Sequence, residues 1–230
     1  MTQTAVILAA GMGTRLGRPW PKPLTPLADG RTIMRQQVDN LTSAFGDELR
    51  IMTVIGFKLE LIIESFPNNL YVYNESYDQT NTNRSLLKAL KLSGPGGVLW
   101  MNGDVVFDPR VLDRVKEYID RDESIICVNT AVVGDEEVKY RVDADGFVNE
   151  LSKQVVNALG ESVGINFVAK KDKELLISGL EACQDSDYFE RGIEIMVDLH
   201  GSRVRPVDIS DLFAVEVDFE EDLTRANSYL

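Results

Sequence analysis

The sequence predicts an α/β fold: one Rossmann-like domain over residues 1–230, with a mostly parallel mixed sheet flanked by helices and a small antiparallel hairpin. Three observations indicate it. Short apolar runs alternate with segments of helical length, a glycine-rich turn follows the first apolar run, and an Asp145-Gly146 turn separates two strand-like runs. Alternation of this kind builds βαβ units, whose ligands bind at the carboxyl ends of the strands.

The first half of the chain supplies the regular alternation. Residues 5–8 (Ala-Val-Ile-Leu) form an apolar run without helical periodicity, so they predict a buried strand. The same reasoning applied along the chain predicts strands near 4–9, 50–57, 70–74 and 97–104, helices near 31–45, 58–65 and 83–92, and a helix beginning near Pro109.

The second half begins with the hairpin, which we expect over 138–153 and antiparallel to the main sheet, because Asp-Gly between two alternating runs favours a tight hairpin turn. The elements expected after it are strands at 163–170, 203–209 and 213–218, helices near 172–184 and 187–199, and a terminal helix.

Composition excludes several classes of function. The net charge of −13 argues against nucleic-acid or membrane-surface binding. The chain begins with a strand and contains no bilayer-length apolar run, so we expect a cytoplasmic protein. Two cysteines in apolar surroundings predict reduced thiols, and a single histidine leaves little for histidine metal sites or Ser-His-Asp chemistry.

The stretch "LAAGMGTRLGRPWPKPL", residues 8–24, follows the first predicted strand. Its glycines permit close backbone approach, and exposed amides together with Arg15, Arg18 and Lys22 suit a polyphosphate. The Gly-Lys pair of a Walker loop is absent, and Gly17 stands one residue too late for the dinucleotide fingerprint. An ordinary surface turn with solvated cations is the alternative.

The same stretch resembles the opening L-A-A-G-x-G-T/S-R and following P-K-P of the sugar-phosphate nucleotidyltransferase family. The resemblance implies a nucleotide-diphospho-sugar transferase-like fold whose loop wraps a nucleoside triphosphate. It implies that Arg15 contacts the phosphates that leave as pyrophosphate and that Lys22 lies beside the reacting phosphoryl group, both as exposed loop cations. The nucleotide-binding residues that it implies here are Leu8, Ala9, Ala10, Gly11, Met12, Gly13, Thr14, Arg15 and Lys22.

Two aspartates follow predicted strands far apart in the sequence. Asp104 comes after "LWMNG", and Asp218 closes "FAVEVD". Each is equally explained as a helix cap, whereas the family resemblance implies that both bind Mg²⁺ and that Gly103 lies at the nucleotide. Glu216 is expected on the same side of its strand as Asp218.

Base and acceptor residues rest on a resemblance to the phosphocholine and phosphonate cytidylyltransferase branch. The Q-x-x-P-x-G element of uridylyl- and thymidylyltransferases is absent, and "NTNRSL" in its place matches that branch at Asn81 and Ser85. The resemblance implies that these two contact the base or the acceptor, and that Lys153 contacts the acceptor phosphate as a third catalytic cation. Capping and turn roles, and a solvated lysine, are the alternatives.

The acceptor pocket is expected beside the helix that carries "DYFERGIEIMVDL". Glu190 and Glu194 share one helical face, where a carboxylate suits an amine or a quaternary ammonium, and Tyr188 and Phe189 add aromatic contacts. An exposed acidic face explains them equally well.

The sequence therefore predicts a magnesium-dependent cytidylyltransferase that joins CTP to a small phosphorylated or phosphonate acceptor and releases pyrophosphate. The candidate acceptors are phosphocholine, 2-aminoethylphosphonate, a hydroxyalkylphosphonate and inositol or sugar phosphates. The expected state is a monomer or homodimer without nucleic-acid or membrane partners. The alternatives are a nucleotidyltransferase that makes a UDP-, dTDP- or GDP-sugar and a non-catalytic nucleotide-binding module.

Overall fold

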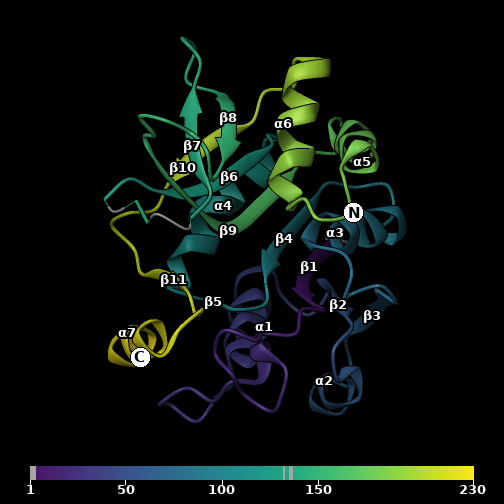
Figure 1. The fold of residues 1–230 in the computed structure, drawn as a ribbon, viewed down its shortest axis with the longest axis vertical. Coiled ribbons are helices and arrows are strands. Elements are labelled where there is room, and N and C mark those ends of the chain that lie inside the picture. The colour runs from purple at the N-terminus through teal and green to yellow at the C-terminus, as the bar shows by residue number, and fades with distance from the viewer. Residues whose placement is uncertain (1–3, 132, 135–136) are drawn as a thin grey trace.

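The computed structural model describes residues 4–131, 133–134 and 137–230, and its ribbon is shown in Figure 1. The strands are β1 (Thr4–Ala9), β2 (Arg50–Ile55), β3 (Leu70–Tyr73), β4 (Val98–Asn102), β5 (Val105–Phe107), β6 (Ile125–Asn129), β7 (Lys139–Val142), β8 (Val148–Ser152), β9 (Gly160–Val168), β10 (Arg205–Asp208) and β11 (Ala214–Glu216). The helices are η1 (Lys22–Leu24, a 3₁₀ turn), α1 (Ile33–Phe45), α2 (Leu59–Ser65), α3 (Thr82–Leu92), α4 (Arg110–Asp120), α5 (Lys173–Ala182), α6 (Phe189–His200) and α7 (Glu220–Tyr229).

The main sheet has the strand order β10-β6-β9-β4-β1-β2-β3. Neighbouring strands pair in parallel except β9, which is antiparallel to both β4 and β6. The predicted α/β fold with a mostly parallel mixed sheet is therefore confirmed. The antiparallel β9 brings its first residues to the edge where its neighbours end.

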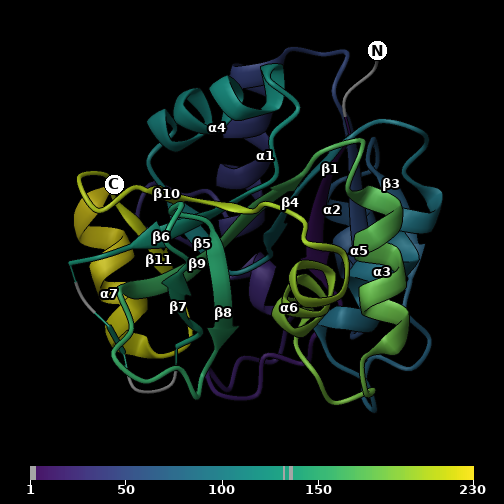
Figure 2. The ribbon, with the colours of Figure 1, turned by 90° about the horizontal axis from the view of Figure 1, so that it is seen from above.

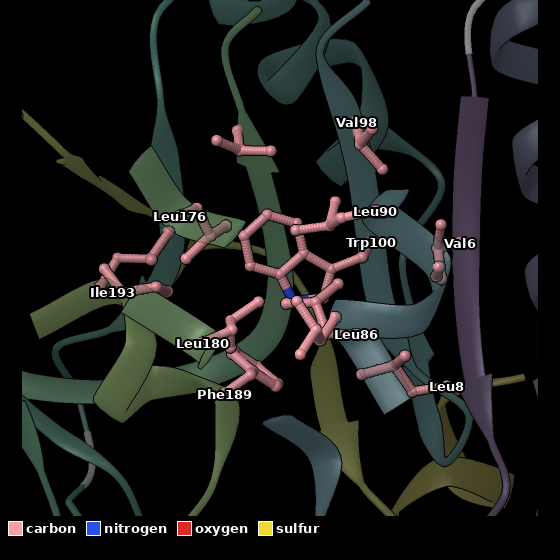
Figure 3. Packing of buried hydrophobic residues seen from close by; sticks show 14 of the residues in the cluster. Val6, Leu8, Leu86, Leu90, Val98, Trp100, Leu176, Leu180, Phe189 and Ile193 are labelled. Carbon is pink, nitrogen blue, oxygen red and sulfur yellow. The ribbon is translucent and has the colours of Figure 1, made fainter. Parts of the chain in front are cut away.

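Helices cover both faces of this sheet (Figure 2). On one face, α3, α5 and α6 bury a cluster centred on Trp100, against which Leu86, Leu180 and Phe189 lie (Figure 3). On the other face, α1, α2 and α4 bury a second cluster that includes Met34, Ile62 and Leu112. Because strand residues alternate between the faces, successive residues of β4 belong to different clusters.

The expected hairpin forms from β7 and β8, and β7 pairs antiparallel with the start of β9. Its attachment to the sheet has a second support, because the amide of Val148 donates to the carbonyl of Val204. The hairpin thus lies beside α6, as Figure 1 shows.

A second, two-stranded sheet differs from the expectation. The predicted strand at 213–218 is the short β11, which pairs antiparallel with β5, a strand that sequence reasoning missed. The Gly103-Asp104 turn separates β4 from β5, so two strands that follow each other directly in the chain belong to different sheets. Helix α7 packs on this small sheet through Leu223 and Ala226. In the part of the chain that the structure describes, no helix has the length and apolar character that a bilayer crossing requires.

Candidate active site

A cavity of ≈ 300 Å³ opens at the carboxyl ends of β1 and β4. The starts of α3 and α6, the first residues of β9 and the end of β11 complete its wall. Its lining residues are Leu8, Ala9, Gly11, Gly13, Thr14, Arg15, Lys22, Pro23, Thr82, Asn102, Gly103, Asp104, Glu137, Val138, Lys153, Ser162, Tyr188, Phe189, Glu190, Glu216 and Asp218. A ligand pocket at this edge of the sheet agrees with the general rule for open α/β folds.

The glycine-rich loop lies along one side of the cavity and packs directly on Lys22. Gly13 adopts φ +59°, and a Cβ atom added there would lie 2.9 Å from Cβ of Lys22. A glycine is therefore required both for the backbone conformation and for the close approach. The predicted loop residues Ala10 and Met12 do not line the cavity, since Ala10 packs in the core and Met12 points to solvent.

Lys22 joins the two aspartates that sequence spacing singled out. Its ammonium donates to Asp104 Oδ2 at 2.7 Å and to Asp218 Oδ1. The side chain of Lys22 is only 10% exposed, so the expectation of an exposed loop cation is wrong for this residue. The physical reason is the η1 turn, which begins at Lys22 and directs it under the loop.

The charges of this group are matched. Burial disfavours the ammonium of Lys22, but the carboxylates of Asp104 and Asp218 outweigh it, so the pKa of Lys22 lies above its usual value. Burial also disfavours the charged form of Asp218, yet the hydrogen bond from Lys22 and the charges of Lys22 and Arg15 hold its pKa below the usual value. Arg15 donates to Asp218 Oδ2 at 2.8 Å and remains 47% exposed. The two pKa shifts therefore favour the charged forms of both Lys22 and Asp218.

The structure separates the two aspartates from helix capping. At the start of α4, the amide of Arg110 donates to Asp108, not to Asp104. At the start of α7, the carboxylate of Asp222 accepts from the amides of residues 218 and 219. The carboxylates of Asp104 and Asp218 are thereby left for Lys22, Arg15 and the cavity.

Lys153, Tyr188 and Glu190 lie at the other end of the cavity. The ammonium of Lys153 lies 4.9 Å from the centre of the Tyr188 ring. Glu190 is 6% exposed, and burial raises its pKa to about 7 although the charge of Lys153 opposes the shift. Its Oε2 atom is buried and has no hydrogen-bond partner among the described residues.

Two further acids, which the sequence did not assign to the site, line the cavity. Glu137 comes from the segment before β7, and Glu216 comes from β11; burial raises the pKa of both. Asn102 donates to Glu216 at 3.0 Å, and Gly164 leaves room for this pair, because a Cβ atom there would lie 2.7 Å from Nδ2 of Asn102. Proximity to Asp218 was the signal for Glu216, whereas no local pattern marks Glu137.

Besides Ala10 and Met12, three predicted site residues lie away from the cavity lining. Asn81 caps α3, where its side chain accepts from the amide of Thr82 at 2.8 Å. Ser85 is buried, and its hydroxyl oxygen accepts a hydrogen bond from the side-chain amide of Asn74 at 3.1 Å. Glu194 accepts from the amide of Leu151, so it joins α6 to the hairpin. The structure thus gives these three side chains hydrogen bonds within the fold.

Comparisons with known proteins agree with this geometry. CMP-5'-(3-aminopropyl)phosphonate synthase of Streptomyces rubellomurinus is 29% identical over 97% of this chain, and the bifunctional protein GlmU of Gluconacetobacter diazotrophicus is 38% identical over 44%. The chain spans about two fifths of the length of the first and about one fifth of the second: 38% and 21%.

Solved structures share the fold. The inositol-1-phosphate CTP transferase from T. maritima superposes with a TM-score of 0.78 at 18% identity, covering 99% of this chain and 95% of its own. The CTP:phosphocholine cytidylyltransferase from Streptococcus pneumoniae gives a TM-score of 0.78 at 17% identity, covering 100% and 99%. Residues 5–173 match the family described as the MobA-like NTP transferase domain. This chain therefore belongs to that nucleotidyltransferase family.

Proposed function

We propose that this chain transfers the cytidylyl group of CTP to a phosphate or phosphonate oxygen of a small acceptor and releases pyrophosphate. The observation that carries the proposal is the convergence of Lys22, Asp104 and Asp218 beside the glycine-rich loop at one end of a cavity. A pocket that gathers cations, carboxylates and open backbone at a strand edge suits a polyphosphate.

The reaction needs no nucleophile from the protein. An acceptor oxygen attacks the α-phosphorus, a new P–O bond forms, the α–β bridging P–O bond breaks, and its electron pair leaves with pyrophosphate. Such transfers depend on positioning and on neutralising negative charge. Arg15 and Lys22 supply positive charge on the triphosphate side, and Lys153 supplies it at the other end, where Tyr188 holds its ammonium.

Magnesium fits the residues present. Carboxylate oxygens are hard ligands, and the buried Oδ1 atom of Asp104 has no hydrogen-bond partner among the described residues. The Lys22 ammonium donates hydrogen bonds to both carboxylates, so Asp104 and Asp218 already share one positive charge. Among the described residues, no group of three or more histidine, cysteine, aspartate or glutamate side chains is arranged to hold a metal ion. Asp104 and Asp218 would hold the ion, which supplies charge neutralisation at the phosphates.

CTP is proposed on two grounds. The chain lacks the Q-x-x-P-x-G element of uridylyl- and thymidylyltransferases. The synthase and the two solved transferases described above carry CMP or CTP in their names. The names of the same three proteins support the proposed acceptor class, a small phosphate or phosphonate.

The test is a pyrophosphate-release screen of the purified chain. CTP, UTP, dTTP and GTP are each combined with phosphocholine, 2-aminoethylphosphonate, hydroxyethylphosphonate and glucose 1-phosphate, with and without Mg²⁺. We expect release with CTP and a phosphate or phosphonate acceptor, only with Mg²⁺ present. A preference for another triphosphate across the whole acceptor panel would refute the nucleotide assignment, and a preference for glucose 1-phosphate together with another triphosphate would favour the alternative, a transferase that makes a UDP-, dTDP- or GDP-sugar.

A further inference from the structure

Three side-chain oxygen atoms of residues that line the cavity lack partners. Asn102 Oδ1, Ser162 Oγ and Glu190 Oε2 are all buried, and none has a hydrogen-bond partner among the described residues. Ser162 and Glu190 are each 6% exposed. A buried oxygen left without a donor costs free energy. A ligand that supplies N–H groups removes that cost.

The charges around Glu190 are unbalanced. Asp104 and Asp218 are bonded to Lys22, whereas the cavity-lining acids Glu137 and Glu190 share the nearby charge of one cation, Lys153. Lys153 lies over the Tyr188 ring and has no ion pair with an acid among the described residues. The excess of acidic side chains over cations makes this part of the cavity suited to a positively charged group, which would stabilise their ionised forms.

We propose that the acceptor carries a primary ammonium group and that the buried, unpartnered Glu190 Oε2 accepts a hydrogen bond from it. This inference rests on the proposed function, since it names the acceptor's second group. The phosphate or phosphonate of the acceptor then lies toward Lys153 and Lys22, and the ammonium lies toward α6.

The same geometry disfavours a quaternary ammonium. Such a group has no N–H to donate, so it leaves Glu190 Oε2 without a partner, and its recognition depends on open aromatic faces. The cavity offers two rings, and both are engaged. Lys153 covers Tyr188, and Phe189 packs edge-on against Trp100 with ring centres 5.6 Å apart (Figure 3).

Glu190 is suited to respond to an ammonium. Its pKa of about 7 reflects burial first, with Lys153 lowering it and Glu194 raising it, and Glu216 is a further acid within electrostatic range. A bound ammonium adds a positive charge and favours the carboxylate form. Binding of the acceptor therefore releases a proton near neutral pH.

The experiment compares three acceptors of matched length with CTP and Mg²⁺: 2-aminoethylphosphonate, ethylphosphonate and the N-trimethyl analogue of 2-aminoethylphosphonate. Steady-state rates give kcat/KM, and calorimetry gives binding of each phosphonate to the protein. We expect 2-aminoethylphosphonate to exceed each of the others by about tenfold or more, as a charge-assisted hydrogen bond implies. In Glu190→Gln, the ratio of 2-aminoethylphosphonate to ethylphosphonate should fall about tenfold.

The matched control is Asp198→Asn, which makes the same chemical change at an exposed position of α6 and should keep the wild-type ratio. Equal use of the amine and ethyl acceptors, preference for the trimethyl analogue, or an undiminished ratio in Glu190→Gln would overturn the inference. The wild-type acceptor series decides it alone if the variant does not fold. If no triphosphate releases pyrophosphate, the proposed function fails, and calorimetry still decides whether the amine is selected.

Discussion

Replacement of Glu190 by glutamine should change how the stability of the protein depends on pH. Glu190 is buried, and its pKa is raised from 4.5 to about 7 mainly by that burial. The folded protein therefore holds the proton more tightly than the unfolded chain does. The stability that Glu190 contributes is fully present below its pKa in the unfolded chain. It is lost as the pH rises through the pKa of Glu190 in the folded protein.

The size of the effect follows from the two pKa values. They differ by about 2.5, and one pKa unit corresponds to about 1.36 kcal/mol, so ionisation of Glu190 costs the folded protein about 3 kcal/mol. Most of this loss falls between about pH 5 and about pH 8. Glutamine keeps the shape of the neutral acid and cannot ionise, so the variant should escape the loss.

The assay is urea unfolding of wild type, Glu190→Gln and Asp198→Asn across that pH range. Because Glu137 and Glu216 also have raised pKa values, the wild-type curve alone contains several contributions, and the difference between the two proteins isolates Glu190. We expect the glutamine variant to gain about 2.5 kcal/mol relative to wild type on going from about pH 5 to about pH 8. Parallel curves for wild type and Glu190→Gln would refute the reasoning.

Three further variants test the rest of the site. Lys22→Ala removes the buried cation that Asp104 and Asp218 share, although Asp218 keeps its pair with Arg15, so we expect a stability loss of about 3 kcal/mol and a fall in turnover of more than about 100-fold, measured beside the exposed control Lys171→Ala; an unchanged melt would show that the Lys22 ion pairs contribute nothing. Asp104→Ala and Asp218→Ala should each reduce magnesium-dependent activity, and the double variant should lose less than the sum of the two in free energy, whereas additive losses would mean independent roles. Gly164→Ala should destabilise the protein by about 1–3 kcal/mol, because φ is +69° and a Cβ atom would collide with the Asn102 side chain; chemical denaturation measures it, and a neutral result would contradict the packing.

The sequence by itself determined the fold and one end of the candidate site. Alternating apolar runs and helical segments are local patterns, and they predicted the α/β layers because main-chain conformation depends on neighbouring residues. The stretch from Leu8 to Leu24 predicted an anion-binding loop beside a strand end, and its resemblance to nucleotidyltransferases agrees with the family match. Strand-end placement also brought Asp104 to the same edge.

Only the tertiary structure decided which carboxylates are available and which cations are buried. Lys22 lies 82 positions from Asp104 and 196 from Asp218, and no local pattern encodes a contact between them. The η1 turn buries Lys22, and pairing of β11 with β5 carries Asp218 to it. These ion pairs arise from packing between segments distant in sequence.

Tertiary packing also settled which polar residues of the predicted site serve the fold. Asn81 and Ser85 read locally as either ligand contacts or capping groups, and their partners in the folded chain are a helix amide and a buried asparagine. Glu190 and Glu194 are one helical turn apart, yet one lies in the cavity and the other bonds the hairpin. Helical spacing gives the face on which a side chain lies, whereas the elements packed against that face determine what the side chain meets.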